Sequence, residues 1–304
     1  MIDFKVKTGI RNGKETFTEV TLTEADLKQL CSDFFSSRGY ADNKRWVDNR
    51  ISQVEKLKNW KMPQDPIALV FPFYHKDVQQ AERLMDWIAY LDRNNENTCI
   101  LHCDKNTNYN KVLNRAKTCF KKVMVSVYDY KKLSWPSSNS YVFAKASDYM
   151  DANLPNTSWL WMETDGVPTK RMWLKRLDIE YKDGKMPFFG NVVDTKKSLH
   201  MNGLGVYPPD LRSWTKNAFL IEHNDNCQSW DMAMADEIKN FVCKGNDFID
   251  HVWNVDENFK PCYGDGQIPS FSDNSQVDKI LDPKTLIFHR NKDLTLIDFL
   301  KRKI

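Results

Sequence analysis

No stretch of the sequence approaches the ~20 consecutive apolar residues that a helix needs to cross a membrane. Residues 1–5 lack the basic and then apolar pattern of a secretory signal peptide. The seven cysteines are scattered, and the pair Cys99 and Cys103 has no second close pair to complete a zinc site. We therefore expect a cytoplasmic protein with reduced thiols and no membrane attachment.

Two glycine-rich signatures are also missing. The sequence has no GxGxxG after its first predicted parallel strand and no GxxxxGK[ST] anywhere, which disfavours a dinucleotide oxidoreductase and a P-loop nucleoside triphosphatase. Charge of neither sign dominates, with 44 Lys and Arg against 41 Asp and Glu, so net charge does not identify nucleic acid as a partner. A nucleotide bound here needs another device for its diphosphate, and a metal ion on carboxylates is the obvious one.

The order of the apolar segments predicts an α/β fold with a mostly parallel central sheet. Strands are expected at 67–71, 98–102, 123–127 and 159–162, and helices between them at 78–91, 109–120 and 141–150. Asp77 is expected to cap the first of these helices. Ligands of such sheets bind beyond the carboxyl ends of the strands, which are here at Phe71 and Pro72, at Asp104, and at 163–165.

Residues 1–62 differ from the rest and are expected to form a small, mainly helical N-terminal extension to a single domain at 63–304. Asn12-Gly13 predicts a hairpin, and amphipathic helices are expected around 23–34 and 47–57. The extension is interpreted either as an acceptor-binding appendage or as a packing element.

The most informative segment is 159–165, an apolar run that ends in two carboxylates one residue apart. Side chains at i and i+2 of a strand point to the same side, so Glu163 and Asp165 can share one ligand. Carboxylates at the exit of a strand suit a hard divalent cation that carries phosphates. An acidic turn without a ligand is the alternative for an isolated pair of this kind.

Four elements, in order and within about residues 66–300, resemble the GT-A glycosyltransferases, which transfer a sugar from a nucleotide-sugar donor. The first is the strand and helix start, where the resemblance implies Phe71 and Pro72 at the nucleotide mouth and Asp104 after the second strand. The second is 135–143, similar to the family's WP-x-G-x-N-x-x-F segment, with Ser138 in place of the usual glycine. The resemblance implies that Asn139 of this segment binds the donor.

The third element is Glu163-Thr164-Asp165, which looks like the family's DxD motif. The resemblance implies that Asp165 contacts a metal ion, while Glu163 contacts ribose, sugar, metal or metal-bound water. The fourth is the apolar run that ends in His289, implied as a third metal ligand, with a purely structural histidine as the alternative. Lys292 is then expected to reach a phosphate, against the alternative of a solvated surface lysine.

The acceptor side has two candidate residues. Gly203 permits a close backbone approach or a positive φ beside a bound sugar, and a tight hairpin is the alternative. Asp231 stands at the expected start of a helix, where the resemblance implies a general base in inverting enzymes. The alternative for Asp231 is a helix N-cap.

The resemblance implies transfer from a nucleoside-diphosphate sugar, with a UDP-sugar and Mn²⁺ (or Mg²⁺) as the default. The chain is also similar to phage enzymes that glycosylate hydroxymethylated pyrimidines in DNA, so such DNA is an expected acceptor. Exposed aromatics, Trp214 or Trp253, would then stack on bases. Lys121, Lys122, Lys131 and Lys132 would contact phosphates, and a solvated surface is the alternative for these paired lysines. The alternatives are transfer to polysaccharide or protein, a nucleotidyltransferase, and a sugar-nucleotide-binding protein without activity. No obligate protein partner is expected.

Overall fold

The computed structural model describes residues 2–11, 14–22, 52, 55–129, 131–195, 198–220, 229–264 and 266–303. The chain divides into two compact units, Met1–Lys61 and Met62–Ile304. In the first unit, β1 (Ile2–Arg11) and β2 (Lys14–Leu22) pair antiparallel, which confirms the expected hairpin. The helix expected at 23–34 lies outside the described residues, and of the second helix the structure describes residue 52 and a stretch at 55–59.

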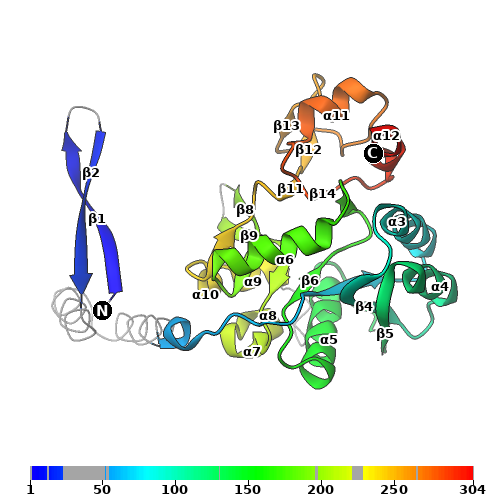
Figure 1. Ribbon diagram of the computed structural model, residues 1–304, viewed down its shortest axis with the longest axis horizontal. Coiled ribbons are helices and arrows are strands. Elements are labelled where there is room, and N and C mark those ends of the chain that lie inside the picture. The colour runs from blue at the N-terminus through cyan, green and yellow to red at the C-terminus, as the bar shows by residue number, and fades with distance from the viewer. Residues whose placement is uncertain are drawn as a thin grey trace. The chain divides into compact units, whose positions relative to one another are not determined.

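The second unit is built on a seven-stranded sheet with the order β10-β8-β9-β6-β3-β4-β5 (Figure 1). Its strands are β3 (Ala68–Phe73), β4 (Asn95–Asp104), β5 (Phe120–Tyr128), β6 (Trp159–Trp161), β8 (Phe188–Thr195), β9 (Ser198–Tyr207) and β10 (Val242–Lys244). Of these seven, only β9 runs antiparallel to its neighbours β6 and β8. The predicted α/β class with a mostly parallel sheet is therefore confirmed.

Three helices make the crossovers of this sheet. α3 (Val78–Leu91) connects β3 to β4, α4 (Asn110–Cys119) connects β4 to β5, and α5 (Ser137–Asn153) connects β5 to β6. β6 lies on the opposite side of β3 from β4, so the direction in which successive strands are added reverses beside β3. Open α/β sheets bind ligands beyond the carboxyl ends of the strands at such a switch point.

The helix α3 has the bounds that its apolar period predicts, but not the predicted cap. Its buried face is made of residues at helical spacing: Ala81, Leu84, Met85, Trp87, Ile88 and Leu91. Asp77 occupies the N-cap position, yet its side chain accepts no hydrogen bond from the first turn. The prediction that Asp77 caps α3 is therefore wrong, and its carboxylate is left for another role.

A second, smaller sheet lies at the carboxyl end of β6. It consists of β11 (Ile249–His251), β14 (Ile287–His289) and β7 (Val167–Pro168). The indole Nε1 of Trp87 donates to the carbonyl of Pro168 at 2.6 Å, which fixes β7 against α3. The helix α12 (Thr295–Lys303) follows β14 and lies beside α3, where Arg83 and Asp298 form an ion pair of 2.9 Å (Figure 1).

The remaining elements are helices and a pair of short antiparallel strands outside the two sheets already described. They are α6 (Trp173–Gly184), α7 (Leu211–Trp214), α8 (Asn217–Leu220), α9 (Trp230–Ala233), α10 (Ala235–Ile238), β12 (Asn254–Val255), β13 (Pro261–Cys262) and α11 (Asn274–Ile280). Among them α9 packs on the sheet through Trp230, whose ring stacks on Phe143 of α5 with centroids 4.9 Å apart. Phe143 also meets Trp161 edge to face, so an aromatic cluster supports the end of β6.

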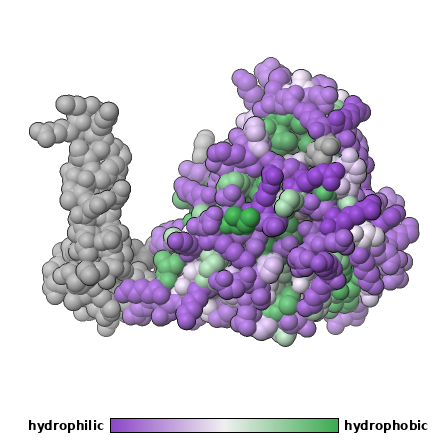
Figure 2. All heavy atoms as spheres, in the orientation of Figure 1, coloured by the Kyte–Doolittle hydropathy of each residue, from purple (hydrophilic) through white to green (hydrophobic). Residues whose placement is uncertain are grey.

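Three further findings concern the helices, the surface and the thiols of the described residues. No helix in the described part of the chain is long and apolar enough to cross a membrane. On the face of the second unit shown in Figure 2, hydrophilic residues predominate and apolar residues form separate spots. The described cysteines, at positions 99, 103, 119, 243 and 262, are unpaired thiols.

The contrast between two N-cap positions gives a test of the fold. Asp273, the N-cap of α11, accepts a hydrogen bond from the amide of Gln276 at 3.1 Å. We expect Asp273→Ala to lower the free energy of unfolding by about 1 kcal/mol because the helix loses its cap. Asp77→Ala removes no cap bond and is expected to cost less. Chemical denaturation of both variants measures this, and an equal loss at the two positions would contradict the structure of α3.

Candidate active site

The site begins with the turn that follows β6. β6 ends at Trp161, and the amide of Gly166 donates to the carbonyl of Glu163 at 3.0 Å to close a turn over 163–166. The expectation that Glu163 and Asp165 lie on one strand is therefore wrong, although the turn still brings both carboxylates to one place. A Cβ on Gly166 would lie 2.8 Å from Cδ1 of Leu204, so glycine allows this turn to pack against β9.

The pairing of two short strands brings a histidine to these carboxylates. β7 leaves the turn and pairs antiparallel with β14, with Val167 opposite Phe288. His289 is the last residue of β14 and the next in this register, so it lies opposite the turn. The expected apolar strand ending in His289 is thus present, and its register explains how residues far apart in sequence meet.

Glu163, Asp165 and His289 form one cluster of possible metal ligands. One ligand atom from each lies within 4.8 Å of the other two. Nε2 of His289 is 3.3 Å from Oδ1 of Asp165 and 3.7 Å from Oε2 of Glu163. Within the described ranges, no other group of three or more His, Cys, Asp and Glu side chains has this spacing.

The charges in the cluster are strongly coupled. The side chain of Asp165 is 2% exposed, and burial would raise the pKa of its carboxyl, but the charges of His289 and Lys292 hold that pKa below its usual value. Burial alone would lower the pKa of His289, but the charge of Asp165 outweighs it and raises the pKa to about 9. The imidazole is therefore protonated at neutral pH when only these side chains surround it.

Two further side chains fix the orientation of His289. Its Nδ1 lies 3.1 Å from Oδ1 of Asn202 and 2.9 Å from Nδ1 of His251. Burial, followed by the positive charges of His289 and Arg290, lowers the pKa of His251 to about 2, so His251 is neutral. Because the amide oxygen of Asn202 can only accept, it favours a hydrogen on Nδ1 of His289 and directs Nε2 towards the carboxylates.

This donor set fits a divalent cation. Carboxylate oxygens suit Mn²⁺ and Mg²⁺, and imidazole is a frequent ligand of transition metals. Both carboxylate oxygens of Asp165 and Nε2 of His289 are buried without a hydrogen-bond partner. Their contacts are ion pairs with each other and with Lys292, whose Nζ meets Oδ2 of Asp165. A cation held by the cluster would satisfy all three atoms.

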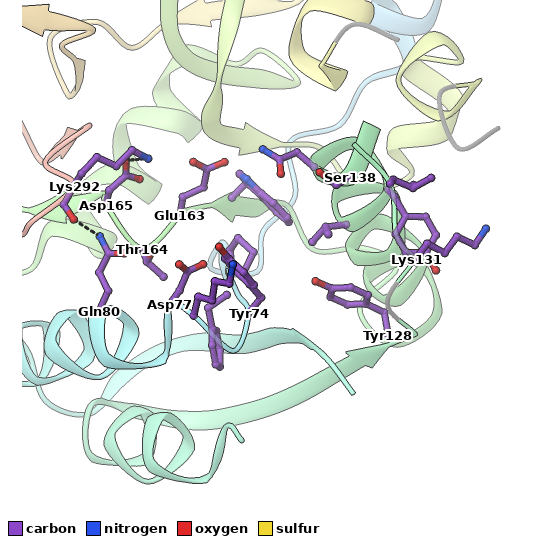
Figure 3. Close-up of a pocket in the computed structure, with 18 residues that line it drawn as sticks. Tyr74, Asp77, Gln80, Tyr128, Lys131, Ser138, Glu163, Thr164, Asp165 and Lys292 are labelled. Atoms are coloured by element: carbon purple, nitrogen blue, oxygen red, sulfur yellow. Dashed lines mark hydrogen bonds and ion pairs between the residues drawn. The ribbon is translucent and has the colours of Figure 1, made fainter. Parts of the chain in front are cut away.

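The cluster opens onto a cleft of about 560 Å³ at the switch point of the sheet. Figure 3 shows Asp165 and Lys292 at one end of it, Asp77 in the middle, and Tyr128 with Lys131 at the other end. One end of the cleft is therefore ionic, and the opposite end carries an aromatic side chain and a lysine.

Two residues of the cleft were not predicted from the sequence to belong to a site. Gln80 donates from Nε2 to the carbonyl of Lys292 at 2.7 Å and accepts from Oγ1 of Thr164 at 3.0 Å, so it joins α3 to both halves of the cluster (Figure 3). Asp77 lines the cleft, and burial raises the pKa of its carboxyl. The only sequence signal at Asp77 was its position before a predicted helix, which predicted a cap. Nothing in the sequence pointed to Gln80.

The predicted donor-binding residues divide into two groups. Pro72, Asn139 and Lys292 line the cleft together with Glu163 and Asp165. Phe71, Asp104 and Gly203 are not among the residues that line it.

Phe71 and Asp104 do not line the cleft. Phe71 is fully buried in the core, because its side chain points to the opposite face of β3 from Pro72. The two carboxylate oxygens of Asp104 accept from the amide of Asn106 at 2.8 Å and from Oγ1 of Thr107 at 2.5 Å. Asp104 ends β4 as expected, and its carboxylate closes its own loop. The structure brings neither side chain to the cleft, and the role of Phe71 and Asp104 in donor binding stays a prediction.

Gly203 lies within β9 rather than in a hairpin turn. The space that its side chain would fill is occupied by Trp230, whose Cζ2 would be 2.8 Å from a Cβ there. The close approach that the glycine permits is therefore to an indole ring, and the prediction that Gly203 faces a sugar is not supported by this packing.

Asp231 belongs to the first turn of α9, and Ser229 is the N-cap of that helix. The alternative that Asp231 is the cap is therefore wrong. Its Oδ1 accepts from the amide of Met232 at 2.9 Å and from the hydroxyl of Ser229. Asp231 is not among the residues that line the cleft, and its role as general base stays a prediction.

The two tryptophans proposed for base stacking differ in exposure. Trp214 meets Phe188 and Phe241 edge to face, so its ring packs against other side chains of the fold. Trp253 is 40% exposed, and the guanidinium of Arg290 lies 4.8 Å from its ring centroid. Trp253 also meets His251 edge to face, which places this exposed ring two contacts away from His289.

No protein-family model matches the sequence, and no curated protein is similar to it. Solved structures similar in fold include the galactosyltransferase LgtC with donor and acceptor sugar analogues, at 11% identity and a TM-score of 0.49 over 78% of this chain and 94% of that chain. Mouse xyloside xylosyltransferase 1 shares 9% identity and has a TM-score of 0.43, and the match covers 75% of this chain and 98% of that chain. The bifunctional glycosyltransferase WbbM shares 11% identity and has a TM-score of 0.44, and the match covers 76% of this chain and 46% of that chain.

All three of these proteins are glycosyltransferases. At such low identities and TM-scores, the likeness concerns the course of the chain alone. The function of the present chain therefore has to rest on the chemistry of its own cleft.

The contact between Asn202 and His289 can be tested with a matched control. We expect Asn202→Leu to weaken Mn²⁺ binding roughly 10–100-fold, because His289 loses the acceptor that orients it. Asn191 is equally buried, at 7% exposure, and donates to the carbonyl of Ile249, outside the cluster. Asn191→Leu is expected to reduce stability without this loss of affinity. Electron paramagnetic resonance of bound Mn²⁺ measures the affinity of each variant. Equal affinities of Asn202→Leu and Asn191→Leu would contradict the orienting role.

Proposed function

We propose that this chain is a metal-dependent glycosyltransferase that moves a sugar from a nucleoside-diphosphate sugar to an acceptor hydroxyl. The proposal is carried by the convergence of Glu163, Asp165 and His289 beyond the carboxyl ends of β3 and β6, beside a cleft. The cleft volume of about 560 Å³ lies within the range of ~300–1,000 Å³ typical of small-molecule sites.

The ionic end of the cleft suits the diphosphate. Glu163, Asp165 and His289 would hold the cation, which when bound neutralises charge on the phosphates. Lys292 supplies a second positive charge at the same end. Transfer breaks the bond between the anomeric carbon and a diphosphate oxygen, and its electron pair stays on that oxygen. Fixed positive charge there stabilises the leaving group more than the intact donor, which is the requirement for catalysis.

The opposite end of the cleft suits the nucleoside. Tyr128 and Tyr141 line it and meet edge to face at 6.2 Å, and Trp161 forms part of the wall. Aromatic faces of this kind bind a base and a ribose by stacking and by burial of apolar surface. We take a UDP-sugar with Mn²⁺ as the default donor, as the resemblance to GT-A enzymes implies.

The acceptor hydroxyl must lose its proton as the new bond forms. Asp231 is our candidate for the base if transfer inverts the anomeric carbon, and this assignment is supported by the resemblance alone. Asn202 and Gly203, on the neighbouring strand β9, lie between α9 and the metal cluster through their contacts with His289 and Trp230.

We further propose a hydroxymethylated pyrimidine in DNA as the acceptor, as in the phage enzymes that the sequence resembles. Trp253 supports this proposal because an exposed ring beneath a guanidinium is a surface on which a nucleobase stacks. Lys131 lines the cleft, where its ammonium lies 4.9 Å from the ring centroid of Tyr141, whereas Lys121 is paired with Glu96. Lys131 is therefore our candidate for a phosphate contact.

The donor proposal is tested by thermal unfolding with UDP, other nucleoside diphosphates and their sugars, each with and without Mn²⁺. We expect a Mn²⁺-dependent rise in melting temperature with one nucleotide, since a ligand at 100 times its Kd adds about 2.7 kcal/mol to the free energy of unfolding. Asp165→Ala should abolish the Mn²⁺-dependent part and the turnover, but leave the fold intact. Asp148→Ala is the control and should change neither, because this acid of α5 is paired with Arg212 of α7, outside the cleft.

The products distinguish the competing functions. A glycosyltransferase releases nucleoside diphosphate, a nucleotidyltransferase releases pyrophosphate, and a binding protein releases neither. The absence of a shift with every nucleotide, or full activity of Asp165→Ala, would contradict the proposal.

The acceptor proposal is tested with paired oligonucleotides that contain either 5-hydroxymethylcytosine or cytosine. We expect release of UDP to be stimulated only by the hydroxymethylated strand, and Trp253→Ala to reduce that stimulation about tenfold, since a stacked base is worth ~1–3 kcal/mol. Hydrolysis of the donor without acceptor should not change in this variant. Equal rates with both oligonucleotides, or stimulation by a polysaccharide or protein instead, would contradict the DNA acceptor.

A further inference from the structure

Asp165 carries a charge that needs a partner even in the absence of ligands. Its side chain is 2% exposed, and both carboxylate oxygens are buried. Nζ of Lys292 forms an ion pair with Oδ2, while His289 approaches Oδ1. A buried carboxylate is tolerated only where an opposite charge faces it. Lys292 thus stands as a counter-ion at one of the oxygens that a metal ion would bind.

The backbone of Lys292 is held by two hydrogen bonds, whereas its side chain is half exposed and is held by the ion pair with Asp165. Its carbonyl accepts from Nε2 of Gln80 at 2.7 Å, and its amide donates to the carbonyl of Arg290 at 3.1 Å. Arg290 has a φ of 87°, a left-handed value that turns the chain sharply after β14. The side chain of Lys292 is 48% exposed and borders the cleft. Its ammonium group can therefore leave Asp165 while the backbone stays in place.

We propose that Lys292 is an internal counter-ion, which Asp165 exchanges for the divalent cation, and that the released ammonium then binds the diphosphate of the donor. This inference rests on the proposed function. The ammonium and a metal ion compete for the same carboxylate, and a bound cation repels the ammonium from Asp165. The open cleft beside the cluster is where the proposed diphosphate lies, so the displaced charge meets a new partner there.

The exchange links two binding events. In the ligand-free protein the cation has to displace Lys292, which lowers the metal affinity. When a diphosphate offers Lys292 another partner, this competition is removed. By thermodynamic linkage, metal ion and diphosphate then raise each other's affinity by the same factor. If Lys292 stayed permanently on Asp165, it would give no such coupling.

The test is Lys292→Met, which keeps the length of the side chain and removes its charge. We expect Mn²⁺, titrated without nucleotide and followed by electron paramagnetic resonance, to bind about tenfold more tightly, within the usual range for coupled sites. UDP, titrated by calorimetry at saturating Mn²⁺, should bind about tenfold more weakly. Opposite changes in the two affinities identify the exchange, because a residue that only supports the fold would weaken both.

Lys76→Met is the matched control for the general electrostatic field. Lys76 lines the same cleft but forms no ion pair with Asp165. Lys76→Met should bind Mn²⁺, titrated without nucleotide, with nearly the affinity of the wild type. A gain in Mn²⁺ affinity equal to that of Lys292→Met would overturn the exchange.

Three results separate the inference from the function on which it rests. Unchanged or weaker Mn²⁺ binding by Lys292→Met, while the wild type binds both Mn²⁺ and UDP, overturns the exchange and leaves the function standing. Binding of UDP by a wild type that takes no Mn²⁺ also overturns it, because Lys292 and His289 would then be the permanent cations of the cleft. A wild type that binds neither ligand overturns both.

Discussion

A carboxylate with almost no exposure to water requires positive charge around it, and this requirement at Asp165 governs the arrangement of the cleft. The turn after β6 buries the carboxylate, so the chain has to bring basic groups to it from elsewhere. The short pairing of β7 with β14 does this, because its register sets His289 opposite the turn. Lys292 follows three residues later and covers the side of Asp165 that faces the cleft.

The contacts around this pairing keep the two halves in place. Trp87 holds β7 through the carbonyl of Pro168, and Gln80 holds the segment after β14 through the carbonyl of Lys292. Both side chains come from α3, which the large sheet positions through the crossover from β3 to β4. One helix therefore connects the parallel sheet, the turn with its two acids, and the segment after β14 that carries Lys292.

The sequence predicts the local features of this fold well and the outcome of packing poorly. The bounds of α3 and the parallel order of the strands follow from hydrophobic periodicity, which each segment carries in itself. Glu163, Asp165 and His289 could be predicted as a group because their motifs occur in a familiar order, although the turn geometry of the two acids could not. Gln80 could not be found at all, since its partners are backbone and side-chain groups distant in sequence. For Asp104, short-range hydrogen bonds that leave no pattern in the sequence decide the role.

The separation of Asp165 and His289 along the chain has a consequence for biosynthesis. The two residues are 124 positions apart (289 minus 165), and β7 has no partner until β14 has been made. At about 5–20 residues per second, a ribosome needs roughly 6 to 25 s to cover that interval. For this time the nascent chain has its acids but not its histidine or lysine, so Asp165 must stay in contact with water. The cleft can therefore close into its final form only after His289 and Lys292 have been synthesised.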